Sequence, residues 1–362
     1  DETYERYNNM TGELKHKIID SITQNEDEEY CFKLCDGKCP MLDDNGLCEI
    51  HKNLGEDYLG VVCKQFPRYS EYYGTIKESG IGLACEEAAR IILSENRPFS
   101  METAACDEQY EPSSEYDSSF ALQIFAARDS VFKILAEESL SIHEKLIVIL
   151  DMGSKIQQCI NTDEYDNIKS VVNDYLKEGI THTLEETRNL SDSGQFENIS
   201  LQQGIRQILY PYEEMEVLNP EWDVILKDII DSLFEQMNDE EYNILNEEFG
   251  TYMVSRAYEY RQLLEYLVFR YFAKSIYDYD FLGKCQMLVT NFFVIRQMDI
   301  IRWLDNHREY SFKDRMDVVH IFSRQVEYSE DNIENLYEDF IFDDIFKTDS
   351  LIAILWIDSE NI

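Results

Sequence analysis

The sequence predicts a mainly α-helical protein, in which a Cys-rich irregular N-terminal segment with a small β-hairpin is followed by an all-helical domain. Three observations predict this fold class. Pro and Gly are scarce, at 6 and 14 of 362 residues, which favours long helices with short connections. Six of the nine cysteines lie between residues 31 and 85. From Ser118 onward, apolar residues recur at helical spacing.

The N-terminal third contains only short periodic segments. Residues 1–30 form one predicted polar helix with a narrow apolar stripe. A second helix is expected over residues 49–59. Residues 69–83 predict a hairpin that turns near Gly74, because two runs rich in strand-forming residues flank that glycine. A helix over residues 86–94 follows, with small and apolar residues on its inner side.

Residues 95–116 are irregular and acidic, which is typical of a linker. A chain of 362 residues and 42.8 kDa can bury a large core, and its length favours two domains. The sequence therefore divides into a Cys-rich metal-binding region, residues 1–104, and a helical domain, residues 105–362.

The helical domain is predicted from segments whose apolar residues recur at helical spacing. These segments are residues 120–135, 142–156, 168–176, 222–237, 252–277, 281–303, 315–322 and 329–340. Residues 189–198 are polar and predict a loop. The aromatic-rich segments 252–277 and 281–303 are apolar on most faces, so we expect them to form the buried centre, where aromatic residues pack as ordinary core.

The charge of the chain limits its partners. Asp and Glu outnumber Lys and Arg by 73 to 32, which gives a formal net charge of −41. Nucleic acids and anionic lipids bind clustered Lys and Arg, so no nucleic acid or membrane partner is expected. The acidic field attracts metal ions, Lys-rich proteins or a cationic cofactor. The same charge is also consistent with simple solubility.

The compartment is predicted from the thiols and from the absence of targeting signals. No basic segment followed by an apolar stretch opens the chain, so no signal peptide is visible. Apolar runs such as residues 288–295 are much shorter than the ~20 residues that span a membrane. Nine cysteines is an odd number, and Cys106, Cys159 and Cys285 lie in helical sequence. This pattern favours reduced thiols in a cytoplasmic protein.

Thiolates gathered in one region either form disulfides or hold a soft metal centre, and here the metal is favoured. Cys31-x3-Cys35-x3-Cys39 is not a standard zinc knuckle, and the later cysteines are widely spaced. Iron–sulfur clusters accept dispersed thiolates, so spacing leaves both Zn and iron–sulfur open. The candidate ligands are Cys31, Cys35, Cys39, Cys48, Cys63 and Cys85. Of the histidines, only His51 is placed to join them.

Four segments of the Cys-rich region carry a family resemblance. They are Cys39-Pro40-Met41-Leu42-Asp43-x-x-Gly46-Leu47-Cys48, Leu54-Gly55-Glu56, Cys63-x-x-Phe66-Pro67-Arg68 and Cys85-x-x-Ala88-Ala89-Arg90. Together they resemble the signature of the flagellin lysine-N-methylase family, and a fainter likeness continues after residue 118. Cys39, Cys48, Cys63 and Cys85 match motif positions, whereas Cys31 and Cys35 do not.

The resemblance implies transfer of a methyl group from S-adenosylmethionine to surface lysines of flagellin, by a protein of the bacterial flagellum system with a Cys-bound metal, iron–sulfur or alternatively Zn. The amine attacks the sulfonium methyl in line, with positioning and proton removal by the enzyme. No Gly-rich strand–turn–helix is present, so the cofactor is expected to be held in an unusual way. The residues identify no catalytic base.

Two features depart from that family. Its members usually carry a further Cys-rich segment near the N-terminus that this sequence does not contain, and Tyr328 stands where they tend to have His. A second reading therefore stays open. In it, the protein is a non-catalytic, metal-stabilised interaction module whose thiolates only hold the N-terminal fold together.

Overall fold

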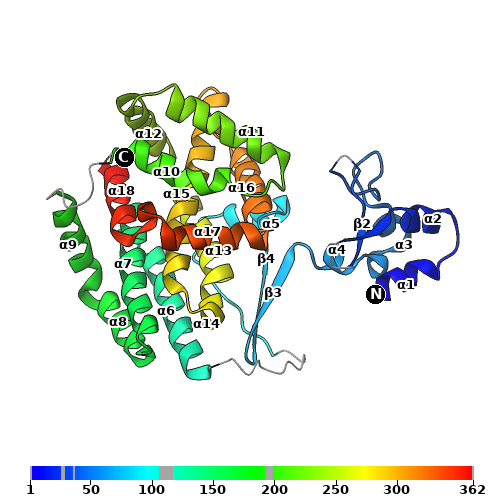
Figure 1. Ribbon diagram of the computed structural model, residues 1–362, viewed down its shortest axis with the longest axis horizontal. Helices are drawn as coiled ribbons and strands as arrows, with labels where there is room; N and C mark the ends of the chain where they lie inside the picture. Colours follow the sequence, from blue (N-terminus) through cyan, green and yellow to red (C-terminus); the bar gives the residue numbers. More distant parts are fainter. Residues whose placement is uncertain (1, 26–28, 36, 106–116, 193–198, 361–362) are drawn as a thin grey trace. The chain divides into compact units, whose positions relative to one another are not determined.

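The computed structural model describes residues 2–25, 29–35, 37–105, 117–192 and 199–360. The chain forms two compact units, Asp1–Tyr69 and Ser70–Ile362, here called unit 1 and unit 2. Unit 2 is built almost wholly of helices, and the only strands in the described residues form two small two-stranded sheets. The predicted fold class is confirmed (Figure 1).

Unit 1 consists of short elements. They are α1 (Glu2–Asn8), α2 (Glu13–Asp20), β1 (Ile22–Gln24), β2 (Tyr30–Phe32), α3 (Glu49–Leu54), the 3-10 turn η1 (Glu56–Tyr58) and α4 (Val61–Gln65). The prediction of one helix over residues 1–30 is wrong, because Gly12 has a φ of 105° and separates α1 from α2. The predicted helix over residues 49–59 likewise ends at Leu54, where Gly55 takes a φ of 85°.

Unit 1 has a small core. Among its described residues, Tyr7, Ile18, Met41 and Ile50 form a buried apolar cluster, and ten partly buried side chains pack against it: Met10, Leu14, Ile19, Ile22, Phe32, Cys39, Cys48, Leu54, Tyr58 and Leu59. β1 and β2 pair antiparallel, with Thr23 opposite Cys31. A unit of this size buries little apolar surface, so such units commonly depend on a metal or on cross-links for stability.

The hairpin and the helix that follows it agree with their predictions. β3 (Arg68–Tyr73) and β4 (Ile76–Ile81) form a two-stranded sheet, and Gly74 in the turn between them has a φ of 60°. α5 (Glu86–Leu93) buries Ala88, Ala89 and Leu93. Almost all of this segment packs with unit 2, so the compact units divide earlier in the chain than residues 104 and 105.

The remaining helices all belong to unit 2. They are α6 (Ser118–Ala136), α7 (Ile142–Asn161), α8 (Ile168–Asp174), α9 (Ile180–Asp192), α10 (Leu201–Glu213), α11 (Pro220–Ile229), α12 (Asp239–Met253), α13 (Ala257–Tyr271), α14 (Ser275–Asp278), α15 (Phe281–Asp305), α16 (Phe312–Val326), α17 (Glu330–Phe342) and α18 (Thr348–Glu360). Short 3-10 or π turns join several of them: η2 (Tyr165–Asn167), η3 (Tyr175–Gly179), η4 (Ile230–Glu235), η5 (Val254–Arg256), η6 (Phe272–Lys274) and η7 (Asp344–Phe346).

α15 is the central helix of unit 2. Nearly all of its residues are buried, as the apolar sequence of residues 281–303 predicts. It packs against α7, α11, α13 and α16, which surround it in Figure 1. Its start is fixed by Asp280, whose carboxylate accepts a hydrogen bond of 2.8 Å from the Gly283 amide.

Local capping fixes other helix starts in the same way. Ser141 and Glu144 form a capping box that starts α7, and Ser311 and Asp314 form another that starts α16. α11 begins with Pro220 in its first turn, where proline is favoured. These starts set the rotation of α11, α15 and α16 about their axes, and hence the side chains that they turn toward one another.

Among the described helices of unit 2, the sequence analysis missed four: α9, α10 and α18 lie outside every segment predicted to be helical, and α12 lies outside them except for its last two residues. α18 (Thr348–Glu360) was not predicted, although residues 351–356 are almost all apolar and buried. α9 continues to Asp192, into the first part of the predicted loop over residues 189–198, and residues 193–198 lie outside the described part. Residues 106–116 of the predicted linker also lie outside it. In the described residues, no helix is long and apolar enough to cross a membrane.

Candidate functional site

Three of the candidate metal ligands lie on neighbouring turns of unit 1. Cys39 begins the turn that leads to Leu42, and its carbonyl accepts a hydrogen bond of 3.2 Å from the Leu42 amide. Cys48 is the N-cap residue of α3 and forms an isolated bridge with Leu42. Cys63 lies on α4. The positive φ of Gly46, 75°, allows the tight turn that returns the chain to Cys48.

The thiols of Cys39, Cys48 and Cys63 lie within electrostatic reach of one another. The pKa of the Cys63 thiol is raised, first by desolvation and then by the negative charges of Cys39 and Cys48. Cys39 and Cys48 are half-buried against the small core of unit 1. These three residues, which come from distant sequence positions of unit 1, are here called the thiol cluster.

Tyr7 lies beside the thiol cluster. Burial raises the pKa of its phenol to about 12, and the charges of Cys63, Cys48 and Cys39 contribute to the same shift. The Tyr7 hydroxyl donates a hydrogen bond of 2.6 Å to the Tyr58 carbonyl. The phenol thus stays protonated and connects α1 to the turn that precedes α4.

Cys31 and Cys35 lie at the edge of this region. Both are exposed. Cys31 is in β2 and lines a mainly apolar cavity of about 800 Å³ together with Cys63 and Tyr7. Cys35 forms an isolated antiparallel bridge with Lys38. Cys63 is therefore the residue that connects the thiol cluster to the cavity that Cys31 lines.

The remaining candidates are placed differently. Cys85 is the N-cap residue of α5 in unit 2, where its charge acts on Tyr328. His51 lies on an exposed position of α3. Cys159 and Cys285 are buried, as expected of cysteines that pack as small apolar residues. Cys106 lies outside the described residues.

The type of side chain in unit 1 suits a soft metal, whereas the placement of these side chains does not yet form a metal site. Thiolates are the ligands that Zn and iron–sulfur clusters prefer, and three converge beside a core of four buried side chains. Across the described ranges, however, no three His, Cys, Asp or Glu side chains are placed to hold one metal ion. Binding would require the thiols to draw closer together.

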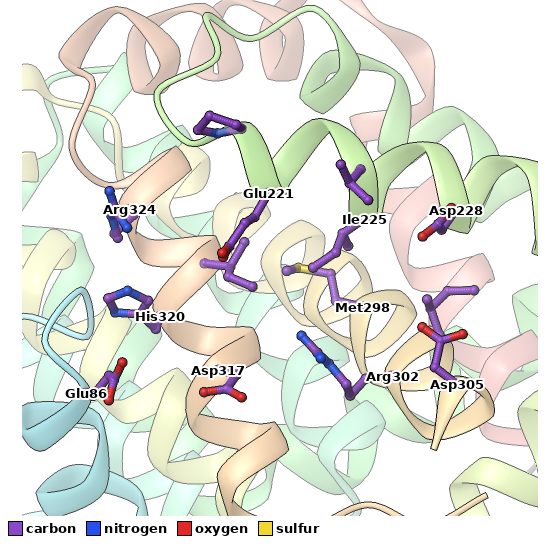
Figure 2. Close-up of a pocket in the computed structure, with 14 residues that line it drawn as sticks. Glu86, Glu221, Ile225, Asp228, Met298, Arg302, Asp305, Asp317, His320 and Arg324 are labelled. Atoms are coloured by element: carbon purple, nitrogen blue, oxygen red, sulfur yellow. The ribbon is translucent and has the colours of Figure 1, made fainter. Parts of the chain in front are cut away.

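A second candidate site is an open cavity of about 820 Å³ in unit 2, here called the α11–α15–α16 cavity (Figure 2). These three helices line it, and Glu86 from the start of α5 completes it. Its apolar wall consists of Val224, Ile225, Met298, Ile301 and Ile321. The volume and the partly apolar lining are typical of pockets that bind small organic molecules, ~300–1,000 Å³.

Charged groups of both signs surround this wall. Arg302 and Arg324 line the cavity, and in the described part of the chain neither guanidinium makes an ion pair or a hydrogen bond. The same holds, among the described residues, for four lining carboxylates: Glu86, Glu221, Asp228 and Asp305. Asp317 differs, since its carboxylate pairs with Lys313 at 2.6 Å. Opposite charges thus face the cavity without direct pairing.

The arrangement of these charges is visible in Figure 2. Asp228 and Asp305 lie at one end of the cavity, and His320 and Arg324 lie at the other. The Arg302 side chain extends from α15 into the space between them. Such a cavity can accommodate a ligand that carries both an anionic and a cationic group.

His320 adds an uncharged polar group to the lining. Burial, and then the positive charge of Arg324, lower the pKa of its imidazole below the usual value near 6.5. The ring is therefore neutral at pH 7. Its Nδ1 atom is buried and, within the described residues, has no hydrogen-bond partner. A neutral imidazole does not repel a cationic ligand.

None of these lining residues was identified from the sequence. A signal was present, because the residues repeat at helical spacing on each helix: Glu221, Ile225 and Asp228 on α11, Met298, Arg302 and Asp305 on α15, and Asp317, Ile321 and Arg324 on α16. In a single helix this pattern is also typical of an ordinary solvated face. The tertiary packing of three such faces distinguishes the cavity.

Comparisons with known proteins assign most of the helical unit to a family and find short matches to curated proteins. The model of the FliB lysine N-methylase C-terminal domain family matches residues 128–354. The chain is 37% identical over 59 residues to the flagellar biosynthetic protein FliU of Salmonella muenchen, and this match covers 16% of the chain and 35% of that protein. The lysine-N-methylase of Salmonella typhimurium is 37% identical over 59 residues, again 16% of the chain but 15% of that protein. No solved structure matches.

Proposed function

The chain belongs to the FliB lysine N-methylase family, and we propose that it transfers methyl groups from S-adenosylmethionine to the ε-amines of surface lysines of flagellin. The single observation that carries this proposal is the family match over residues 128–354. All lining residues of the α11–α15–α16 cavity except Glu86 fall within that range. The names of the relatives support the choice of flagellin as substrate.

The reaction is a nucleophilic displacement. The lone pair of the neutral lysine amine forms a bond to the methyl carbon as the carbon–sulfur bond of the sulfonium breaks, and S-adenosylhomocysteine leaves. The proton of the original ammonium passes to a base or to water. The enzyme must hold the two reactants in line and exclude competing water. The strongly acidic charge of the chain, −41, favours encounter with a Lys-bearing partner and with a cationic cofactor.

We further propose that the thiol cluster holds a soft metal centre, an iron–sulfur cluster or alternatively Zn. Cys39, Cys48 and Cys63 are the central ligands, and Cys31 and Cys35 of the same unit are the remaining candidates there. The metal-binding role of Cys85, which belongs to unit 2, stays a prediction from the sequence. The convergence of three thiols on a very small core supports this proposal. When bound, such a centre would supply cross-linking of the turns in unit 1.

The proposed activity is tested with full-length protein prepared and reconstituted anaerobically. It is incubated with purified flagellin and S-adenosylmethionine that carries a labelled methyl group. Mass spectrometry should find the label on lysine side chains of flagellin and on none of the same flagellin after its lysines have been acetylated. Absence of methyl-lysine with metal-loaded protein would refute the activity.

A second candidate function is favoured by the small core of unit 1. In it, the thiolates only stabilise a protein-interaction module, because four buried side chains leave such a unit marginal. Binding of S-adenosylmethionine distinguishes the two, since an interaction module has no need of the methyl donor. Binding of flagellin without binding of S-adenosylmethionine would favour the module.

A further inference from the structure

The unpaired charges of the α11–α15–α16 cavity define what kind of ligand it fits. A purely cationic ligand would leave Arg302 and Arg324 without partners, and a purely anionic ligand would leave four carboxylates without partners. A group that carries a carboxylate beside an ammonium satisfies both signs. Five of these six groups are exposed in the free protein, so the cost arises when a bound ligand covers them. A charged group that a ligand desolvates without pairing costs free energy, so a ligand that pairs with both signs is favoured over one that pairs with a single sign.

Arg302 and Asp305 are placed for such a zwitterion. They lie three residues apart near the end of α15, so their side chains leave the same face of the helix. Asp305 is exposed and Arg302 is half-buried, and no ion pair joins them in the described structure. The guanidinium fork of Arg302 matches a carboxylate, and the Asp305 carboxylate matches an ammonium.

The other lining residues provide apolar surface and further carboxylates, which can contact the parts of a ligand that lie beyond its carboxylate and ammonium. Met298 and Ile301 are buried on the same face of α15 and form its floor, and Ile225 faces them from α11. This apolar surface can contact a flat heterocyclic ring. Glu221 and Asp228 can accept hydrogen bonds from hydroxyl groups, and their negative charges favour a sulfonium.

We propose that the α11–α15–α16 cavity binds S-adenosylmethionine, with Arg302 pairing with the carboxylate of its methionine part and Asp305 with its ammonium. This inference rests on the proposed function, because it takes the methyl donor from it. The charge pattern, the apolar floor and the volume of about 820 Å³ each agree with this ligand. The cavity thus holds the donor, and the flagellin lysine approaches from its open side.

The test is calorimetric titration of S-adenosylmethionine into the full-length, metal-loaded protein and into its Arg302→Gln variant. Wild type should bind, and the variant should bind at least ~10-fold more weakly, because a charge-assisted pair is lost. The matched control is Arg308→Gln. Arg308 is exposed just beyond the same helix and pairs with Glu248, so its variant should bind within about 2-fold of wild type.

Comparing two ligands on wild type and on Arg302→Gln tests specifically whether Arg302 binds the carboxylate. Decarboxylated S-adenosylmethionine lacks the carboxylate that Arg302 is proposed to bind, so it should bind wild type more weakly and be unaffected by Arg302→Gln. Asp305→Asn should weaken the binding of S-adenosylmethionine, while the melting temperature of the variant stays close to that of wild type. Equal losses with both ligands in the Arg302→Gln variant would overturn the carboxylate assignment.

The outcomes separate this inference from the proposed function. If wild type binds no S-adenosylmethionine, the proposed function fails and the inference fails with it. If wild type binds it and Arg302→Gln binds it equally well, only the inference is overturned. Loss of flagellin binding in Arg302→Gln, with binding of S-adenosylmethionine intact, would assign the cavity to the protein substrate and would also overturn the inference.

Discussion

His143 Nε2 lies 2.7 Å from Asp358 Oδ2, in a contact that joins α7 to α18 in the buried interior of unit 2. Asp358 also accepts a hydrogen bond from Asn246 and lies 3.8 Å from the Arg296 guanidinium. α18 is one of the helices that the sequence analysis missed, and this contact connects it to the predicted helix α7. It also gives the protein a predictable response to acid.

The first prediction concerns stability at low pH. Burial alone would raise the pKa of Asp358, but Arg296, His143 and Asn246 outweigh it and lower that pKa to about 2. The unfolded value is ~3.9, so the ionised carboxylate stabilises the fold above pH ~4, and this contribution is lost as the pH falls toward 2. Asp358→Asn should reduce the free energy of unfolding at pH 7 by about 2 kcal/mol or more.

Urea denaturation of unit 2 between pH 7 and pH 2 measures this effect. The difference in unfolding free energy between wild type and Asp358→Asn should shrink as the pH falls from 4 to 2. At low pH the Asp358 carboxylate of wild type is protonated and becomes neutral, as the Asn amide is at every pH. A difference that stays constant over that range would contradict the assignment. Asp344→Asn is the control, because Asp344 is exposed and pairs only with the exposed Lys347.

The second prediction concerns the buried charge of Arg315. This side chain is 1% exposed, and its guanidinium pairs with Glu259 at 3.0 Å and with Asp299 at 2.6 Å. Arg315→Met would leave the buried Asp299 carboxylate without its cation, whereas Glu259 would keep its pair with Arg256 at 2.7 Å. The substitution should cost ~3–5 kcal/mol of unfolding free energy. Arg308→Met, which removes an exposed ion pair with Glu248, should cost at most ~1 kcal/mol. Equal losses of unfolding free energy in the two variants would show that the buried ion pairs of Arg315 contribute little to stability.

The third prediction concerns the close approach of α7 and α15. A Cβ atom added at Gly153 would lie 2.5 Å from Cys285 Sγ, so Gly153→Ala should destabilise unit 2 by ~1–3 kcal/mol. In a Cys285→Ala background the sulfur is gone. The same substitution should then cost much less, because only the Cβ atom of residue 285 remains close, at 3.2 Å, and Ala favours a helix over Gly by ~1 kcal/mol.

Thermal or urea unfolding of the four proteins in this double-mutant cycle checks the prediction. A loss of the same size in both backgrounds would contradict a clash with Cys285. Gly60→Ala serves as a further control, since no atom lies within 4 Å of its added Cβ and its φ is −61°.

The fourth prediction concerns the thiol cluster. Cys63→Ser should lower the metal content per chain of anaerobically reconstituted protein by at least ~2-fold, because the Cys63 thiol lies within electrostatic reach of Cys39 and Cys48 and shares a cavity with Cys31. Elemental analysis and acid-labile sulfide measure the loss. Cys159→Ser, a buried position on α7 of unit 2, should retain the wild-type content. Full metal content in Cys63→Ser would exclude this residue as a ligand.

The sequence predicted most of the helical unit because its signals are local. Residues 281–303 are apolar on most faces and form the buried α15, and the hairpin around Gly74 follows from turn chemistry. Four helices of this unit, α9, α10, α12 and α18, were nevertheless missed, and in unit 1 the errors lie where a glycine backbone angle interrupts the helical pattern. Gly12 and Gly55 both adopt positive φ values: Gly12 lies between α1 and α2 as the N-cap residue of α2, and Gly55 ends α3, where the apolar pattern alone would have continued a helix.

The candidate sites were predictable to different degrees. Cysteine density alone selects the thiol cluster, although it does not indicate that Cys63 connects the others. The α11–α15–α16 cavity could not be predicted from the sequence, because Arg302, Asp228 and Arg324 each have the pattern of a solvated residue on its own helix. Only the tertiary packing of the three helices brings their unpaired charges to one space.

The four short helices of unit 1, of 7, 8, 6 and 5 residues, have a practical consequence for handling the protein. They contribute little to the far-ultraviolet circular dichroism of a chain whose long helices all lie in unit 2. A preparation exposed to air or to chelators would therefore give a strongly helical spectrum and a sharp melting curve even with unit 1 unravelled. Proteolytic resistance of the first 69 residues is the better measure of an intact sample.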